Sequence, residues 1–191
     1  MLTGIYGGSF NPIHTGHTRL AQWLVDEGVV GEMWLLVTPQ NPLKATEGLM
    51  PDDLRLRLAR IAVQPLRHVC ASDFEFRLPR PSYMVHTLAA LRAAYPERNF
   101  ALVIGADNWQ RFPQWYRADE ILAHHPVIIY PRPRCHIDAA ALPSGVTLTQ
   151  APLFDISSTE IREAMTRDPS YDGQGLDPAV WHVLKAMTRD L

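Results

Sequence analysis

The chain has 191 residues, 18 basic and 20 acidic side chains, a formal net charge of −2, and 47% hydrophobic residues. This size and composition fit one globular domain, and the near-neutral charge argues against a protein that coats nucleic acid. Two cysteines without a C-x-x-C motif exclude a disulfide scaffold and disfavour a structural zinc site. No apolar run approaches the roughly 18 residues of a membrane helix, and no signal peptide precedes the first strand. We therefore expect a cytoplasmic protein with no membrane partner.

Apolar runs and helical periodicity predict strands and helices that alternate along the chain. In chain order we expect a strand at 2–6, a helix at 15–27, a strand at 33–38, a helix at 52–64, a strand at 69–76, a helix at 82–94, a strand at 100–104, a helix at 117–123, strands at 127–130 and 146–150, and helices at 158–166 and 177–188. Because most strands are continuously apolar, this pattern favours an α/β fold with a doubly wound parallel sheet and helices on both faces. Ligands of such sheets bind at the carboxyl ends of the strands.

The segment after the first predicted strand reads G-G-S-F-N-P-I-H-T-G-H over residues 7–17. Its two leading glycines allow the backbone to bring N–H groups close to a ligand. The helix start that follows offers unpaired N–H groups and the positive end of the helix dipole. His14 and His17 point toward the same side of that helix start. The segment therefore predicts a phosphate cradle with two imidazoles, and it is neither a Walker loop nor a G-x-G-x-x-G fingerprint.

A second segment, I-S-S-T-E-I-R at residues 156–162, places hydroxyl side chains at a helix start and an arginine one turn later. Ser157 and Ser158 suit a helix cap, so an isolated segment of this kind is as typical of a capping box as of a binding site. Arg162 can also reach phosphate oxygens with its planar fork of donors. Together with the first segment, it favours nucleotide binding, which is compatible with capping.

These two segments resemble the G-G-S/T-F-D/N-P-x-H-x-G-H and I-S-S/T-T-x-I-R signatures of the HIGH-type nucleotidyltransferase superfamily. Three further segments are similar to those of its nicotinate-nucleotide adenylyltransferase family. They are P-Q-N-P-L-K at 39–44, R-P-S-Y-M-V-H-T-L at 80–88, and G-A-D at 105–107 followed by F-P-Q-W-Y at 112–116. In the first of them Asn41 and Leu43 replace the usual Pro and His, whereas Lys44 keeps its position. The resemblance extends from Gly4 to about Arg162.

The resemblance implies one Rossmann-like nucleotidyltransferase domain over residues 1–191, with a small helical extension over 158–191. It implies an enzyme of NAD biosynthesis that transfers AMP from ATP to nicotinate mononucleotide, with Mg²⁺ carried by ATP rather than held by a protein site. The implied catalytic residues are His14, His17, Lys44 and Arg162. The implied ATP-binding residues are Gly7, Gly8, Ser9, Phe10, His14, His17, Gly105, Asp107, Ser157, Ser158 and Arg162. The implied residues for the nicotinate nucleotide are Ser9, Lys44, Thr87, Trp115 and Tyr116.

Three alternatives stay open. Nicotinamide mononucleotide differs from the acid by one charge and is the alternative acceptor. Another adenylyltransferase of the superfamily, such as one that acts on pantetheine phosphate, shares the first motif but should lack the arrangement from Gly105 to Trp115. A catalytically inactive nucleotide-sensing module is the alternative from another class, and the retained histidines, Lys44 and Arg162 argue against it. The sequence does not determine the oligomeric state.

Several other residues are interpreted as structural or solvent-facing. The arginines of the helix predicted at 52–64 indicate a solvated face, because near-neutral charge provides no wider basic surface: Arg55, Arg57 and Arg60. Two histidine-containing pairs, His124–His125 and Cys135–His136, lack a second ligand pair at metal spacing. Residues 132–144 are expected to form an exposed loop. Only two of the basic residues are lysines, and we expect Lys44 to face the phosphates and Lys185 to lie at the surface.

Overall fold

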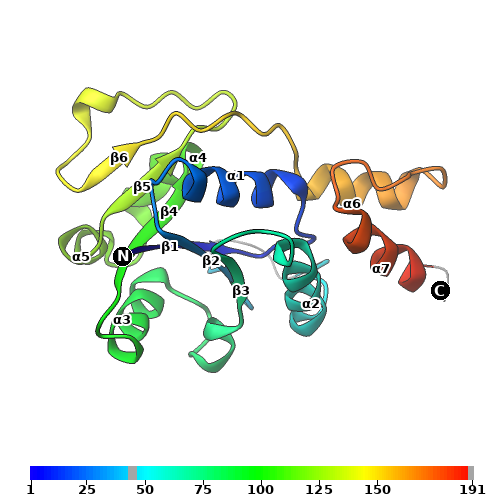
Figure 1. Ribbon diagram of the computed structural model, residues 1–191, viewed down its shortest axis with the longest axis horizontal. Helices are drawn as coiled ribbons and strands as arrows, with labels where there is room; N and C mark the ends of the chain where they lie inside the picture. The colour runs from blue at the N-terminus through cyan, green and yellow to red at the C-terminus, as the bar shows by residue number, and fades with distance from the viewer. Residues whose placement is uncertain (43–46, 189–191) are drawn as a thin grey trace.

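A parallel sheet forms the centre of the molecule, and the computed structural model describes residues 1–42 and 47–188 of the chain (Figure 1). The strands are β1 (Leu2–Gly8), β2 (Glu32–Val37), β3 (Val69–Ser72), β4 (Asn99–Gly105), β5 (Val127–Tyr130) and β6 (Val146–Leu148). Their order across the sheet is β3-β2-β1-β4-β5-β6, and every pair is parallel. This is the Rossmann order, in which the strand order reverses between β1 and β4 and ligands bind at that switch point.

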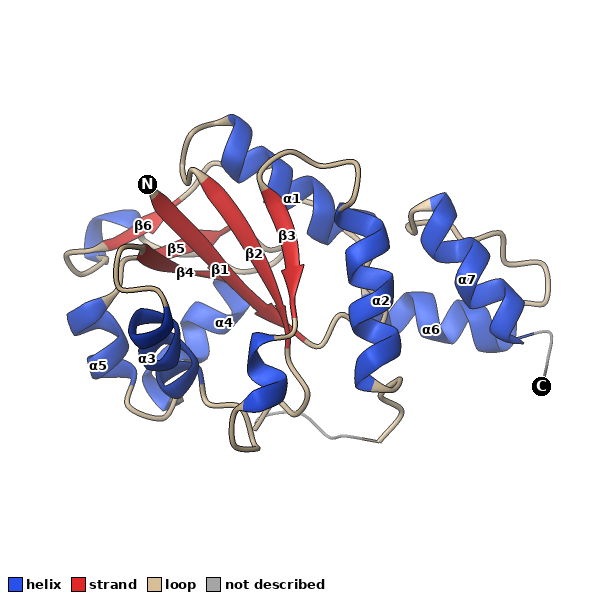
Figure 2. Cartoon of the chain, turned by 60° about the horizontal axis from the view of Figure 1, so that its bottom comes forward, coloured by secondary structure: helices blue, strands red, loops and turns tan. Residues whose placement is uncertain are grey.

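Helices cover both faces of this sheet (Figure 2). The elements are α1 (Thr15–Asp26), α2 (Asp52–Val63), α3 (Met84–Ala94), α4 (Ala106–Arg111), α5 (Ala118–His124), α6 (Ser158–Arg167) and α7 (Pro178–Thr188). Neighbouring strand residues face opposite cores, as the two-residue period of a strand requires. Tyr6 and Val103 pack with α1 and α2, whereas Ile5 and Leu102 pack with α3 and α5. The helices α6 and α7 lie together at the end of the molecule that α2 borders, and Val180 joins the core of α1 and α2.

The predicted doubly wound α/β sheet is confirmed, with two local differences. The strand predicted at 69–76 ends at Ser72, and Phe74–Arg77 form a 3₁₀ turn instead. That turn buries Glu75 completely, although the apolar residues on either side of it suggested a continuing strand. The short helix α4 was not predicted, because its polar sequence A-D-N-W-Q-R shows no apolar face.

The prediction of a solvated arginine face on α2 is wrong for Arg55. Arg57 and Arg60 are exposed, but Arg55 is fully buried. The reason is helical periodicity, because Arg55 lies three and four residues before Leu58 and Ala59, which face the core. The near-neutral net charge of the whole chain does not determine whether a single arginine is buried, because the acceptors of a buried guanidinium can lie inside the protein.

Candidate active site

The loop after β1 folds tightly over the carboxyl end of that strand. Phe10 has a left-handed backbone, with φ of 44°, and its ring packs edge-on against Tyr6 and His17 at centroid distances of 5.7 and 5.0 Å. A Cβ atom on Gly8 would lie 2.9 to 3.2 Å from the Phe10 ring. Glycine is therefore needed where the loop turns back over the strand end. The turn brings the start of α1 to the switch point of the sheet.

The two histidines of the first motif stack at this helix start. Their ring centroids are 3.6 Å apart and their planes are inclined by 25°. The backbone N–H of His14 donates a hydrogen bond to Nδ1 of His17 at 3.2 Å. Because Nδ1 accepts, the proton of the His17 ring sits on Nε2. The geometry therefore makes Nε2 of His17 a hydrogen-bond donor beside the N-terminus of α1.

His14 is an uncharged imidazole at neutral pH. Burial, and to a smaller extent the positive charge of Arg132, lowers its pKa to about 4. Its Nδ1 atom is buried and has no hydrogen-bond partner among the described residues. The ring can take part in a hydrogen bond with a ligand, but it supplies no full positive charge.

A small hollow beside the histidines lies at the carboxyl ends of β1 and β5. Tyr6, His14, His17, Tyr130 and Arg132 contribute to its wall. The hydroxyl groups of Tyr6 and Tyr130 form a hydrogen bond of 3.0 Å. Burial raises the pKa of both phenols, so both remain protonated at neutral pH. These side chains give one part of the wall polar groups, among them the cationic guanidinium of Arg132, while Leu20 and Phe154 make another part apolar.

The end of β4 brings a predicted residue and an unpredicted one together. A Cβ atom on Gly105 would lie 2.4 Å from Oδ1 of Asp107 and 3.0 Å from Cγ of Arg132. Glycine therefore allows both side chains to approach the strand end, where Nε of Arg132 lies 3.6 Å from Oδ1 of Asp107. The prediction of an exposed loop over 132–144 does not hold for Arg132, which is partly buried. Its place directly after β5 is the signal that could have identified it.

The second motif touches the first, although they lie 146 positions apart. The Ser157 hydroxyl accepts from the backbone N–H two residues on, which confirms its capping role. The Ser158 hydroxyl donates to the carbonyl of Pro12 at 3.0 Å. Arg162 donates to the carbonyl of Asn11 at 2.7 Å and to that of Ser158 at 3.1 Å. These bonds place the Arg162 guanidinium, which has five N–H donors, against the loop that leads to the histidines.

Aromatic side chains gather where the sequence predicts the pyridine pocket. Trp115 packs against Phe112 at a centroid distance of 5.2 Å, and its buried Nε1 has no hydrogen-bond partner in the part of the chain that the structure describes. Tyr116 is 53% exposed, and its ring lies 5.0 Å from Tyr83 and 5.7 Å from His86. This arrangement offers flat surfaces to a ring and an indole N–H to an acceptor.

Thr87, also predicted for this pocket, is buried at the start of α3. Its hydroxyl donates to Oε1 of Glu75 at 2.8 Å. Burial raises the pKa of Glu75, and the Thr87 hydrogen bond opposes that rise. The Thr87 hydroxyl is thus used within the protein. The sequence interpretation missed Glu75, and its only signal was an acidic residue between two phenylalanines.

Lys44, predicted to bind phosphate, lies outside the described residues. Over residues 1–42 and 47–188, no group of three or more His, Cys, Asp or Glu side chains could hold a metal ion. No helix in the described part of the chain is both long enough and apolar enough to cross a membrane.

Residues 5–164 match the family described as cytidylyltransferase-like. A protein of Bacteroides thetaiotaomicron named probable nicotinate-nucleotide adenylyltransferase is 48% identical over 189 residues, which cover 98% of this chain and 92% of that protein. A protein of Bacteroides fragilis with the same name is 46% identical over 181 residues, or 94% and 89% of the two chains.

Solved structures share the fold. Plasmodium falciparum nicotinic acid mononucleotide adenylyltransferase complexed with NaAD has a TM-score of 0.83 at 20% identity, covering 99% of this chain and 97% of that one. The same enzyme complexed with APC has a TM-score of 0.82 at 19% identity, with the same coverage.

Proposed function

Because the chain belongs to the nicotinate-nucleotide adenylyltransferase family of cytidylyltransferase-like proteins, we propose that it transfers AMP from ATP to nicotinate mononucleotide. The products are nicotinate adenine dinucleotide and pyrophosphate. The observation that carries the proposal is the contact between the two motifs, in which Ser158 and Arg162 bind the loop that leads to the stacked histidines. That contact gathers donors for a polyphosphate at the switch point of the sheet.

The nucleophile of this reaction is a phosphate oxygen of the mononucleotide. It is already an anion at neutral pH, so the reaction needs neither a general base nor a covalent enzyme intermediate. A bond forms between this oxygen and the α-phosphorus of ATP, while the bond from that phosphorus to the bridging oxygen of the β-phosphate breaks in line. Pyrophosphate leaves with the electron pair of the broken bond. The protein contributes positioning and stabilisation of charge.

The first motif stabilises the charge that develops on the α-phosphate. His17 donates a hydrogen bond from Nε2, the nitrogen that carries the proton in this geometry. His14 remains neutral because its pKa is about 4. Positive potential then comes from the N-terminus of α1, from Arg162 and, by family resemblance, from Lys44. Mg²⁺ is part of the substrate, because ATP carries it bound to the triphosphate.

The other predicted contacts belong to the same proposal. The backbone of Gly8 and Ser9 binds phosphate, and Asp107 binds the hydroxyl groups of the adenosine ribose in place of its contact with Arg132. Trp115 and Tyr116 bind the pyridine ring, supported by their aromatic surroundings. We also propose that this reaction takes place in the cytoplasm.

Initial rates with MgATP and three separate acceptors test this function. We expect nicotinate mononucleotide to give pyrophosphate and dinucleotide in equal amounts, with a higher kcat/KM than nicotinamide mononucleotide, and pantetheine phosphate to give no product. An acid-to-amide ratio of kcat/KM near one would contradict the choice of the acid. A protein that binds ATP but releases no pyrophosphate with any acceptor would be a nucleotide-sensing module instead.

A further inference from the structure

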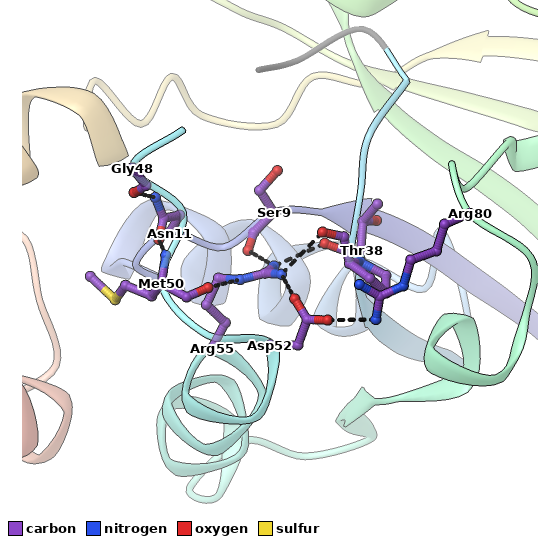
Figure 3. A network of polar contacts seen from close by, with 9 residues as sticks. Ser9, Asn11, Thr38, Gly48, Met50, Asp52, Arg55 and Arg80 are labelled. Carbon is purple, nitrogen blue, oxygen red and sulfur yellow. Dashed lines mark hydrogen bonds and ion pairs between the residues drawn. The ribbon is translucent and has the colours of Figure 1, made fainter. Parts of the chain in front are cut away.

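Arg55 is fully buried at the first turn of α2, and each of its five N–H groups meets an oxygen atom (Figure 3). Four of the acceptors are backbone carbonyls and one is a carboxylate. The contacts of Arg55 run from Nη1 to Ser9 O (2.5 Å) and Thr38 O (2.9 Å), from Nε to Met50 O (3.0 Å), and from Nη2 to Asp52 Oδ1 (2.5 Å) and Pro39 O (3.5 Å).

The acceptors come from three separate segments of the chain. Ser9 lies in the loop after β1 that leads to the histidines. Thr38 and Pro39 directly follow β2, and the Thr38 N–H continues the ladder by donating to Gly8 O at 2.9 Å. Met50 precedes α2. The Arg55 guanidinium therefore joins the carboxyl ends of two neighbouring strands to the start of one helix.

Asn11 strengthens the same junction from within the first motif. Its side-chain Nδ2 donates to Gly48 O at 3.0 Å, and its Oδ1 accepts from Met50 N–H at 2.9 Å. Its own carbonyl accepts from Arg162. The phosphate loop is thus held on one side by α2 through Arg55 and on the other by α6 through Arg162.

The carboxylate of Asp52 extends the network to Arg80. This residue lies shortly before Tyr83, whose ring contacts Tyr116 of the predicted pyridine pocket. Oδ1 of Asp52 accepts from Arg55 and its Oδ2 accepts from Arg80 at 2.7 Å. Arg80 belongs to the R-P-S-Y segment that leads into α3. Because the Arg80 side chain is 49% exposed, water screens this second pair more than the first.

A buried guanidinium is costly unless its charge is paired and its donors are satisfied, and buried ion pairs are weak evidence for stability alone. What this arrangement supplies is a fixed spacing between three segments that Arg55 contacts together. Lysine carries three donors on one nitrogen and cannot reach all five oxygens at once. The geometry therefore demands the planar fork of an arginine.

We propose that Arg55 is a positioning residue for adenylyl transfer. It fixes the Ser9 loop relative to the end of β2 and thereby holds the loop and His17 at the positions from which they bind the α-phosphate. This inference rests on the function proposed above. Arg55 is fully buried, so it acts through Ser9 rather than by touching substrate.

Steady-state kinetics of Arg55→Lys test the inference, with Arg57→Lys as the matched control on the exposed face of the same helix. We expect Arg55→Lys to melt cooperatively and to lose about 10²-fold in kcat, the effect of a displacement of about 1 Å, with smaller changes in both KM values. Arg57→Lys should match the unsubstituted enzyme. An Arg55→Lys enzyme with unchanged kcat would overturn the proposal.

Amide hydrogen exchange provides a readout that does not depend on activity. In Arg55→Lys we expect faster exchange in peptides that cover residues 9–11 and 48–50, with unchanged exchange in β4 and α7. Equal exchange in those peptides would overturn the proposal even if kcat falls. If the unsubstituted chain makes no dinucleotide, the proposed function fails, and the exchange comparison still decides whether Arg55 holds the loop.

A second variant covers the case in which Arg55→Lys does not fold. Asp52→Ala removes one of the five acceptors from a partly exposed position and leaves the guanidinium in place. We expect it to show the same exchange pattern in weaker form, with a loss of about 10-fold in kcat, the loss of one hydrogen bond to a charged group. A folded Asp52→Ala protein with unchanged exchange and unchanged kcat would overturn the proposal.

Discussion

At the phosphate end of the site, around the loop after β1, hydrogen bonds from buried and partly buried side chains join this loop to α2 and α6. At the ring end, around Trp115 and Tyr116, aromatic rings pack in tilted and edge-to-face contacts. Arg55, Asn11 and Arg162 make the first set of contacts. Tyr83 and Tyr116 make part of the second, and more than half of the Tyr116 surface is exposed. The two ends therefore differ both in the kind of contact and in burial.

This difference follows from what each end must do. Stabilising charge in a transition state requires donors at fixed positions, because the contribution of a preorganised dipole depends on its geometry. Binding a flat ring needs area more than exact geometry, and aromatic pairs tolerate several arrangements. The phosphate end should thus control the rate of bond formation, and the ring end should control the affinity for the mononucleotide.

Removal of the His17 imidazole should give the largest effect. We expect His17→Ala to lower kcat by about 10²- to 10³-fold, the loss of one transition-state donor. Pyrophosphate release at saturating substrates measures it, with His124→Ala as a control at an exposed histidine. A normal kcat with only a raised KM would remove His17 from the chemical step.

Acidification should weaken the fold through His14. Its pKa is about 4 in the folded protein and about 6.5 in the unfolded chain, so between these values only the unfolded state takes up the proton. The contribution of His14 to stability is full above pH 6.5, and it falls by up to about 3 kcal/mol as the pH drops to about 4. Urea unfolding at pH 7.5 and 4.5 should show a smaller loss in His14→Gln than in the unsubstituted protein. Equal losses in the two proteins would contradict the buried, neutral state of His14.

Loss of the Arg162 guanidinium should weaken the use of ATP. Arg162→Ala should lower kcat/KM for ATP by about 10- to 100-fold, the range for hydrogen bonds to a charged group. The matched control is Arg167→Ala, because the Arg167 side chain is 77% exposed on the same helix. If the two variants behave alike, the Arg162 guanidinium makes no contribution to the use of ATP, and its role is limited to its contacts with Asn11 and Ser158.

At the ring end we expect the smallest effect. Trp115→Leu should lower kcat/KM for nicotinate mononucleotide by about 3- to 10-fold, the contribution of one aromatic contact, and leave the KM for ATP unchanged. Trp115→Phe keeps a stacking face and should recover most of the loss. A change confined to the KM for ATP would place Trp115 outside the pyridine pocket.

The sequence predicts well whatever depends on local pattern. Continuous apolar runs predict the strands, and the rule that ligands bind at strand ends points to the His14–His17 loop. Both motifs came together as the resemblance implied, through the contacts of Ser158 and Arg162.

The residues that the sequence interpretation missed owe their roles to distant partners. Arg55 looked like a surface charge, yet its acceptors at Thr38 and Ser9 lie 17 and 46 positions away along the chain. Glu75 looked like part of a strand, and its partner Thr87 lies 12 positions away on α3. A local sequence pattern indicates the polarity of a segment, but it does not indicate which distant oxygen or hydroxyl will form a hydrogen bond with a buried polar side chain.

The division between the two ends is tested most directly by a single-turnover measurement with both substrates saturating, made on His17→Ala and Trp115→Leu. The account predicts that His17→Ala slows the formation of dinucleotide by about 10²-fold or more, whereas Trp115→Leu forms it at the rate of the unsubstituted enzyme once the mononucleotide is saturating. Equal slowing of the two variants at saturation would contradict it, because the ring end would then share in the chemical step.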